Sequence, residues 1–126
     1  MKRSTTMLVC LSILAVASVL GCEPEYDGLI FSLESDPPGT VEVGRQEVEI
    51  SSGVAAMFHV DIESRGPEAF DDSTELELVS QDTDVFLVRR GEGAREFVLI
   101  GVWEGETEME VRLDCEVVDR VNVTCR

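Results

Sequence analysis

The sequence predicts an all-β protein that folds as a single antiparallel β-sandwich. Three observations support this fold class. Apolar and polar residues alternate with period two along much of the chain, turn-forming residues separate these runs at short intervals, and no stretch longer than about 12 residues follows the helical period. About seven short strands of this kind pack as two sheets around one core.

The clearest alternation spans residues 56–63, where every second residue is apolar and most of the others are polar. The positions that a half-buried strand would turn inward are Ala56, Phe58, Val60 and Ile62. His59 has the opposite parity, so we expect this single histidine to be a surface residue rather than a base or a ligand. Residues 74–79 repeat the pattern with Leu76 and Leu78 inward.

Two further apolar segments follow, over residues 85–88 and 96–103. The second, "EFVLIGVW", is apolar on both parities, which is typical of a central strand with Trp103 near its end. The alternative is a contact patch on the outer face of a sheet. Between the strands lie turn sequences such as "DPPGT" and "RRGEGA", and abundant outward glutamates are expected to discourage edge strands from pairing with another chain.

The N-terminal segment reads as an export signal. A positive start, "MKRSTT", precedes an uncharged run over residues 7–20, which is shorter than the roughly 20 apolar residues that cross a bilayer. The run ends in "VLGC", and Val19 to Cys22 resembles the lipobox of bacterial lipoproteins. The resemblance implies cleavage before Cys22 and acylation of its thiol and new amino terminus, which together form a stable anchor. The alternative is a conventional cut that leaves Cys22 as a disulfide cysteine.

This interpretation divides the chain into three parts. Residues 1–21 are the lipoprotein signal peptide, residues 22–28 a lipid-anchored tether, and residues 29–126 the sandwich domain. The resemblance places the protein in the bacterial cell envelope, and Glu23 directly after the cysteine is compatible with the outer membrane.

The charge of the chain excludes several partners. After residue 21 it keeps all 26 acidic residues and eight arginines, a net charge of about −18. Such a field repels phosphate backbones and anionic headgroups, so we expect no nucleic-acid binding and membrane contact only through lipid. Most acids are interpreted as a solvated surface. A calcium site remains open as an alternative if the loops that carry Asp71, Asp72, Asp82 and Asp84 converge.

No set of residues predicts catalysis, a metal site or a cofactor. The single histidine lacks a nucleophile and an orienting acid nearby in sequence, and neither a Gly-x-Ser-x-Gly motif nor a glycine-rich phosphate loop occurs. Cys115 and Cys125 do not form a C-x-x-C pair, so a cysteine and histidine zinc site lacks ligands. The protein is therefore predicted not to be an enzyme.

Cys115 and Cys125 are expected to form a disulfide, because two exported thiols are more often paired than free. Two registers of the final hairpin compete. A turn near Asp119 and Arg120 would bring the two cysteines opposite each other. A turn at Asp114 and Cys115 would instead begin one long final strand from Val117 and separate the thiols by roughly 33 Å, which excludes the bond.

The segment from Val41 resembles a bacterial immunoglobulin-like domain of the second group, the type found in invasin and intimin adhesins. The matching stretches are "VEVGRQ", "SQDTDVFLV" and "FVLIGVWEGETEMEVRL", in which Gly105 and Thr107 open the penultimate strand. The resemblance implies an immunoglobulin-like sandwich without catalytic residues. It favours a non-catalytic binding or structural domain whose partner is an envelope protein or a glycan.

An alternative function is a small envelope inhibitor or enzyme accessory that acts through a loop. The candidate is "RRGEGAR", which gathers Arg89, Arg90 and Arg95 on an otherwise acidic surface. A plain charged hairpin turn would have the same composition.

Overall fold

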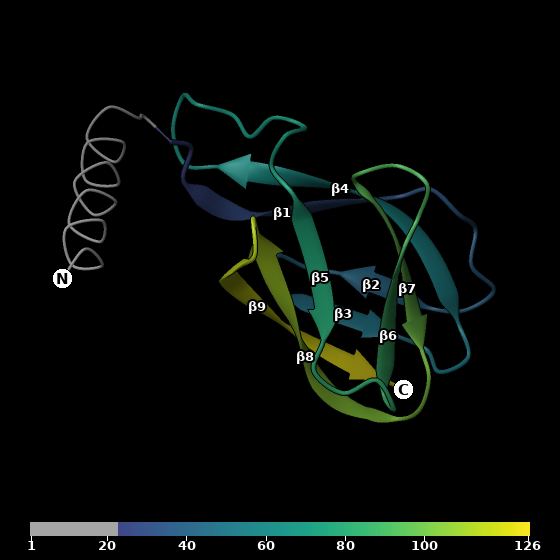
Figure 1. Cartoon of the computed structure of the whole chain (residues 1–126). Coiled ribbons are helices and arrows are strands. Elements are labelled where there is room, and N and C mark those ends of the chain that lie inside the picture. Colours follow the sequence, from purple (N-terminus) through teal and green to yellow (C-terminus); the bar gives the residue numbers. More distant parts are fainter. Residues whose placement is uncertain (1–22) are drawn as a thin grey trace, which may run out of the picture.

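The structure, a computed structural model, describes residues 23–126, so the predicted signal peptide and Cys22 lie outside the described residues. The described part contains nine strands and no helix, and hence no helix long and apolar enough to cross a membrane (Figure 1). In chain order the strands are β1 (Tyr26–Leu33), β2 (Val41–Val43), β3 (Glu47–Ile50), β4 (Ala55–Ser64), β5 (Leu76–Ser80), β6 (Phe86–Arg90), β7 (Glu96–Gly101), β8 (Gly105–Leu113) and β9 (Glu116–Cys125).

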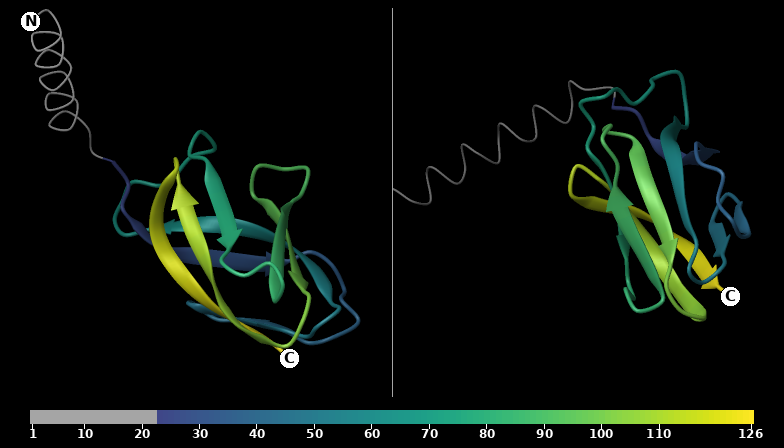
Figure 2. Two further views of the ribbon diagram at one scale, coloured as in Figure 1. Left: turned by 60° about the horizontal axis from the view of Figure 1, so that its bottom comes forward. Right: turned by 90° about the vertical axis from the view of Figure 1, so that its right-hand side faces the viewer.

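The strands form two sheets that pack face to face, as the side views in Figure 2 show. Sheet A has the order β1-β4-β7-β6, and sheet B has the order β2-β3-β9-β8-β5. The predicted β-sandwich is therefore confirmed. The pairing is not wholly antiparallel, however, because β3 runs parallel to β9 with Val48 opposite Val123. Parallel neighbours need a long connection, and the chain between β3 and β9 supplies it by building most of sheet A.

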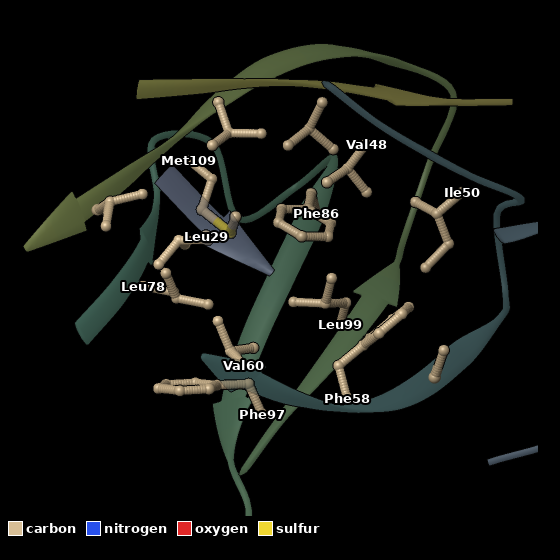
Figure 3. Close-up of a cluster of buried hydrophobic side chains, with 14 of the residues drawn as sticks. Leu29, Val48, Ile50, Phe58, Val60, Leu78, Phe86, Phe97, Leu99 and Met109 are labelled. Carbon is tan, nitrogen blue, oxygen red and sulfur yellow. The ribbon is translucent and has the colours of Figure 1, made fainter. Parts of the chain in front are cut away.

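The core lies between the inner faces of the two sheets (Figure 3). Its largest fully buried side chains are Phe86, Phe97, Ile50, Leu76, Leu99 and Met109. The predicted inward positions Ala56, Phe58, Val60, Leu76 and Leu78 are buried, and Ile62 packs against the core from its rim. The buried core of the described residues extends from Leu29 to Cys125 and joins both sheets, so residues 23–126 contain a hydrophobic core of their own.

Strand β7 occupies a central position between β4 and β6, which confirms the prediction for this apolar segment. Phe97 and Leu99 point into the core, whereas Val98 and Ile100 are half-buried on the outer face. The strand ends at Gly101 rather than near Trp103. A Cβ at Gly101 would collide with the Ser51 carbonyl oxygen, so the backbone passes too close to the β3–β4 connection for any larger residue.

The β8–β9 hairpin turns on two residues, Asp114 and Cys115, with φ angles of +48° and +70°. Positive φ at both positions defines the type I′ turn that matches the twist of paired strands. The ladder runs from Leu113 opposite Glu116 to Gly105 opposite Cys125. A bulge interrupts it at Val118, which has no partner between Val117 and Asp119.

This register overturns the predicted disulfide. Cys115 lies in the turn and Cys125 at the far end of β9, and both are free thiols. Ten residues of strand separate them by roughly 33 Å, far beyond disulfide reach. The second predicted register, with its turn at Asp114 and Cys115, is the one observed.

The boundary predicted between tether and domain is also wrong. Strand β1 begins at Tyr26, so part of the segment assigned to the tether, residues 22–28, belongs to sheet A. Two contacts fix this early start: the Tyr26 hydroxyl donates to Asp119 Oδ2 at 2.8 Å, and the Arg65 amide donates to the Glu25 carbonyl at 2.8 Å. The tether within the described residues is reduced to residues 23–25.

Replacing Cys115 with glycine should stabilise the domain. A non-glycine residue at φ +70° is held in the left-handed region, and glycine removes a cost of about 1 kcal/mol there. We expect the free energy of unfolding, measured by urea denaturation, to rise by that amount in C115G and to stay unchanged in C115S. A loss of stability in both variants would instead favour the disulfide register.

Candidate functional site

The candidate arginine loop lies in the β6–β7 hairpin, at the end of the sandwich where β1 begins. Arg90 extends across the gap between the two sheets. Its Nη2 donates to the Leu76 carbonyl of β5 at 2.6 Å, and its guanidinium lies 5.7 Å from the centre of the Phe97 ring. Glu75 Oε1 is a further 3.8 Å neighbour. The contact is therefore a brace between β6 and β5, the edge strands of sheets A and B.

The other two arginines of the loop have different surroundings. Arg95 donates through Nη2 to the Asp71 carbonyl at 3.0 Å, so it holds the β4–β5 connection against the hairpin. Arg89 is exposed on the outer face of sheet A, and its side chain forms no hydrogen bond or ion pair with residues 23–126. The structure thus does not bring the three guanidinium groups together around one site. Binding through them stays a prediction, with Arg89 as the available side chain.

Arg90 and Arg89 form a matched pair for testing this structural role. We expect R90S to lower the free energy of unfolding by about 1 kcal/mol, because a charged hydrogen bond and a ring contact are lost together. R89S should stay within about 0.5 kcal/mol of the wild type, as for most surface substitutions. Urea denaturation of both variants checks the difference. Equal effects would show that Arg90 is not a brace.

The acidic loops do not converge. Asp71 and Asp72 precede β5, whereas Asp82 and Asp84 follow it, so the two pairs lie at opposite ends of that strand. Two of these carboxylates close local turns: Asp71 accepts from the Ser73 amide and hydroxyl, and Asp82 from the Asp84 amide at 3.0 Å. The hydrogen bonds from the Ser73 hydroxyl and amide lower the pKa of the Asp71 carboxyl. Within residues 23–126 no group of three His, Cys, Asp or Glu is placed to hold a metal, and the calcium alternative lacks its geometric condition.

The single histidine lies on the exposed outer face of sheet A, as predicted. His59 Nε2 is 3.1 Å from Asp61 Oδ1, and Nδ1 is 3.8 Å from Glu34 Oε1. Ser32 is its cross-strand neighbour, but no hydrogen bond joins the two side chains in the described part of the chain. Ser32, His59 and Asp61 therefore do not form a working nucleophile, base and acid, because such a triad needs a continuous hydrogen-bonded relay.

A cleft of about 590 Å³ lies beside the tether. The tether, the β4–β5 connection and the β8–β9 turn enclose it, and Phe70, Leu113 and Val118 contribute apolar surface. Glu23, Glu68 and Glu116 are among the acids along its rim. The Ser73 hydroxyl also lines the cleft and donates to the Asp71 carboxylate, but the lowered pKa of Asp71 makes it a weak base, so the pair offers no evident catalytic chemistry.

Two buried polar contacts were not predicted. The Glu110 side chain is only 10% exposed although it lies on the outer face of sheet B, where Arg112 binds it at 2.8 Å and Arg120 at 3.7 Å. The hydrogen bond from Arg112 lowers the pKa of the Glu110 carboxyl. Burial and the bond to Asp119 raise the pKa of Tyr26. The Glu110-x-Arg112 spacing already indicates that these two side chains share a strand face. Arg120 comes beside Glu110, and Asp119 beside Tyr26, only in the observed register.

Trp103 is the most exposed large apolar residue of the described chain, with 73% of its surface open. It lies in the β7–β8 loop beside Val102, whose amide donates to the Val85 carbonyl at 2.8 Å. This end of the sandwich also contains the C-terminal residue and is opposite the end where β1 begins (Figure 2). The sequence placed Trp103 at a strand end but did not show that its ring is left uncovered.

The two thiols should differ sharply in reactivity. Cys115 is exposed in the turn, while Cys125 is buried beneath Gly101 and burial raises the pKa of its thiol. A raised pKa reduces the reactive thiolate. In residues 23–126, which exclude Cys10 and Cys22, we expect an aromatic disulfide reagent at neutral pH to modify one thiol rapidly and the second only as fast as the domain unfolds. C115S should retain only the slow reaction, and a protein without any titratable thiol would refute the free-thiol structure.

No family model matches the chain, and no curated protein matches it. Solved structures of the S-layer protein SbsC do match. Its domains 4 and 5 are 23% identical over 76% of this chain, with a TM-score of 0.51. Domains 5-6 are 22% identical over 77%, with a TM-score of 0.52, and a structure of domains 4-9 is 18% identical over 82%, with a TM-score of 0.53.

The chain spans 53%, 45% and 14% of these three structures, respectively, so it corresponds to only part of each. At such identities the likeness shows a shared β-sandwich fold. The resemblance to invasin-type domains and to lipoproteins stays a prediction.

Proposed function

We propose that the chain is a lipid-anchored, non-catalytic protein of the bacterial cell envelope whose sandwich acts as a structural or binding module. The observation that carries the proposal is the fold, which is shared with domains of an S-layer protein. The charged side chains that were candidates for binding support the same conclusion, because they have structural roles. Arg90 and Arg95 brace the sandwich, and Asp71 and Asp82 close turns.

The anchor part of the proposal rests on the "VLGC" sequence and on the early start of β1. Only three residues separate Cys22 from Tyr26, so an acylated cysteine would hold the sheet within roughly 14 Å of the lipid. The bond between Arg65 and the Glu25 carbonyl shortens the free part of this link further. A domain held this closely is suited to a layer at the membrane surface. Glu23 after the cysteine supports an outer-membrane address.

The early start of β1 also indicates how the anchored domain would be oriented, and hence at which end a partner would bind. The end that carries the β4–β5 connection and the β8–β9 turn would face the membrane, because β1 starts there. The opposite end, with Trp103, would face away from it. Tryptophan is enriched at binding interfaces because one ring buries a large apolar area. An envelope protein or a glycan would meet this distal end.

Cys22→Ser tests the anchor, and Cys10→Ser is the matched control within the apolar run. We expect the wild type and C10S to carry acyl chains on the mature N-terminus by mass spectrometry and to fractionate with the outer membrane. C22S should lack the acyl mass and stay uncleaved before residue 22. Acyl chains on C22S, or a wild type without them, would refute the anchor, and recovery of the acylated protein in the inner membrane would refute the outer-membrane address.

A further inference from the structure

The four edge strands of the sandwich differ in how they are protected against pairing with another chain. Strand β2 is only three residues long and carries Glu42. Strand β5 carries Glu77 and has its Leu76 carbonyl covered by Arg90, and β6 ends in two arginines. Short length and charged side chains are the usual protection of an exposed edge. Strand β1 is longer, with eight residues, and its one charged residue is Asp27 near its start, so it is uncharged from Gly28 to Leu33.

The open edge of β1 also has free backbone groups. Within the described residues β1 pairs on one side only, with β4. The Glu34 amide donates to the Met57 carbonyl on that side, and the amide of Val60, the partner of Phe31, points to β7 instead. Residues of an antiparallel strand alternate in direction, so Leu29, Phe31 and Leu33 direct their N–H and C=O groups to the open edge. Two apolar side chains of this strand are exposed as well, Ile30 at 49% and Leu33 at 50%.

We propose that β1 pairs with β1 of a second copy of this chain, in an antiparallel two-fold arrangement with Phe31 opposite Phe31 of the partner subunit. This register places outward-directed backbone groups opposite one another, as an antiparallel ladder requires. Leu29 then faces Leu33 of the partner subunit, and Ile30 faces Ser32 of the partner subunit. Sheet A continues across the two-fold axis as one eight-stranded sheet. No charged residue faces one of like sign along the paired segment.

Charge complementarity at the ends of the pairing favours a second copy as the occupant. The register puts Glu34 of the partner subunit opposite Gly28. Arg45 lies over that glycine, with its Nε 3.8 Å from the position of a Cβ on Gly28. The Arg45 side chain is 67% exposed and is shared with Asp27 at 3.2 Å and Glu63 at 3.7 Å. Directly opposed residues lie close enough for Glu34 of the partner subunit to join this cluster, once at each end of the interface.

The overall charge opposes association but does not exclude it here. Residues 23–126 carry about 18 excess negative charges, and these are screened beyond roughly 8 Å at physiological ionic strength. At the β1 edge the paired segment itself is uncharged from Gly28 to Leu33, and the acid at each end, Glu34 of the partner subunit, meets the Arg45 that already holds Asp27 and Glu63. Because repulsion between the remaining acids is screened further by salt while the strand pairing is not, the association should strengthen as ionic strength rises.

Sedimentation equilibrium of residues 23–126, which contain both sheets and the core between them, tests the proposal. We expect the wild type to form a dimer whose dissociation constant lies below about 1 mM. Leu33→Pro removes an outward N–H without breaking a bond to β4 and should weaken the dimer at least about tenfold. Leu33→Ala keeps that N–H and is the control, which should weaken the dimer less than the proline variant. Thermal unfolding of each variant verifies that it folds.

A charge reversal tests the register even if the proline variant does not fold. Glu34→Arg alone should weaken the dimer because it places a guanidinium beside Arg45 of the partner subunit. Adding Arg45→Gln, which removes that like charge without placing a third acid beside Asp27 and Glu63, should recover part of the lost affinity. A wild type that is monomeric at all concentrations up to about 1 mM would overturn the proposal. So would a dimer that Leu33→Pro or Glu34→Arg leaves unchanged. These outcomes do not depend on the lipid anchor, which residues 23–126 lack.

Discussion

The two-residue turn at Asp114 and Cys115 is the constraint on which most of the sandwich depends. It fixes the register of β8 and β9, which lie at the centre of sheet B. Side chains alternate between faces, so a slip by one residue would turn Met109 and Val111 out of the core. The turn is held from outside as well, because the Asp114 amide and carboxylate both bond to the backbone of Glu75 at 2.9 Å.

The Val118 bulge follows from the same register and connects the two sheets. By adding one residue to β9, it directs Asp119 toward β1, where the carboxylate accepts from Tyr26 and from Gln46 at 3.4 Å. The edge strand of sheet A is thereby tied to the β2–β3 turn and to the centre of sheet B. On the opposite side of the sandwich, Arg90 serves the same purpose. The two open sides of the sandwich are closed by polar contacts rather than by apolar packing.

The sequence predicted the features that follow from the alternation of side chains between the two faces of a strand. Alternation identified β4, β5 and their inward residues, because a strand that covers a core must alternate. It could not predict the final register, since Cys115 and Cys125 share a parity in either hairpin and the bulge shifts one strand against the other. The role of the arginines was likewise not readable. "RRGEGAR" shows three basic residues, but only the tertiary structure brings the Leu76 and Asp71 carbonyls beside Arg90 and Arg95. Seven of the eight arginines in residues 23–126 contact a carboxylate or a carbonyl of the domain.

The separation of the two thiols has a consequence for biogenesis. A small exported domain commonly depends on a covalent crosslink for its stability, and hence on the oxidising enzymes of its compartment. Here the core supplies the stability alone, with Cys125 contributing as an apolar side chain at 2% exposure. Folding of residues 23–126 to this structure forms no disulfide, so we expect the yield of native domain not to depend on the redox poise around it. Among the described residues, the remaining exposed sulfur, Cys115, has no second thiol within reach and can form a covalent link only with a group outside residues 23–126.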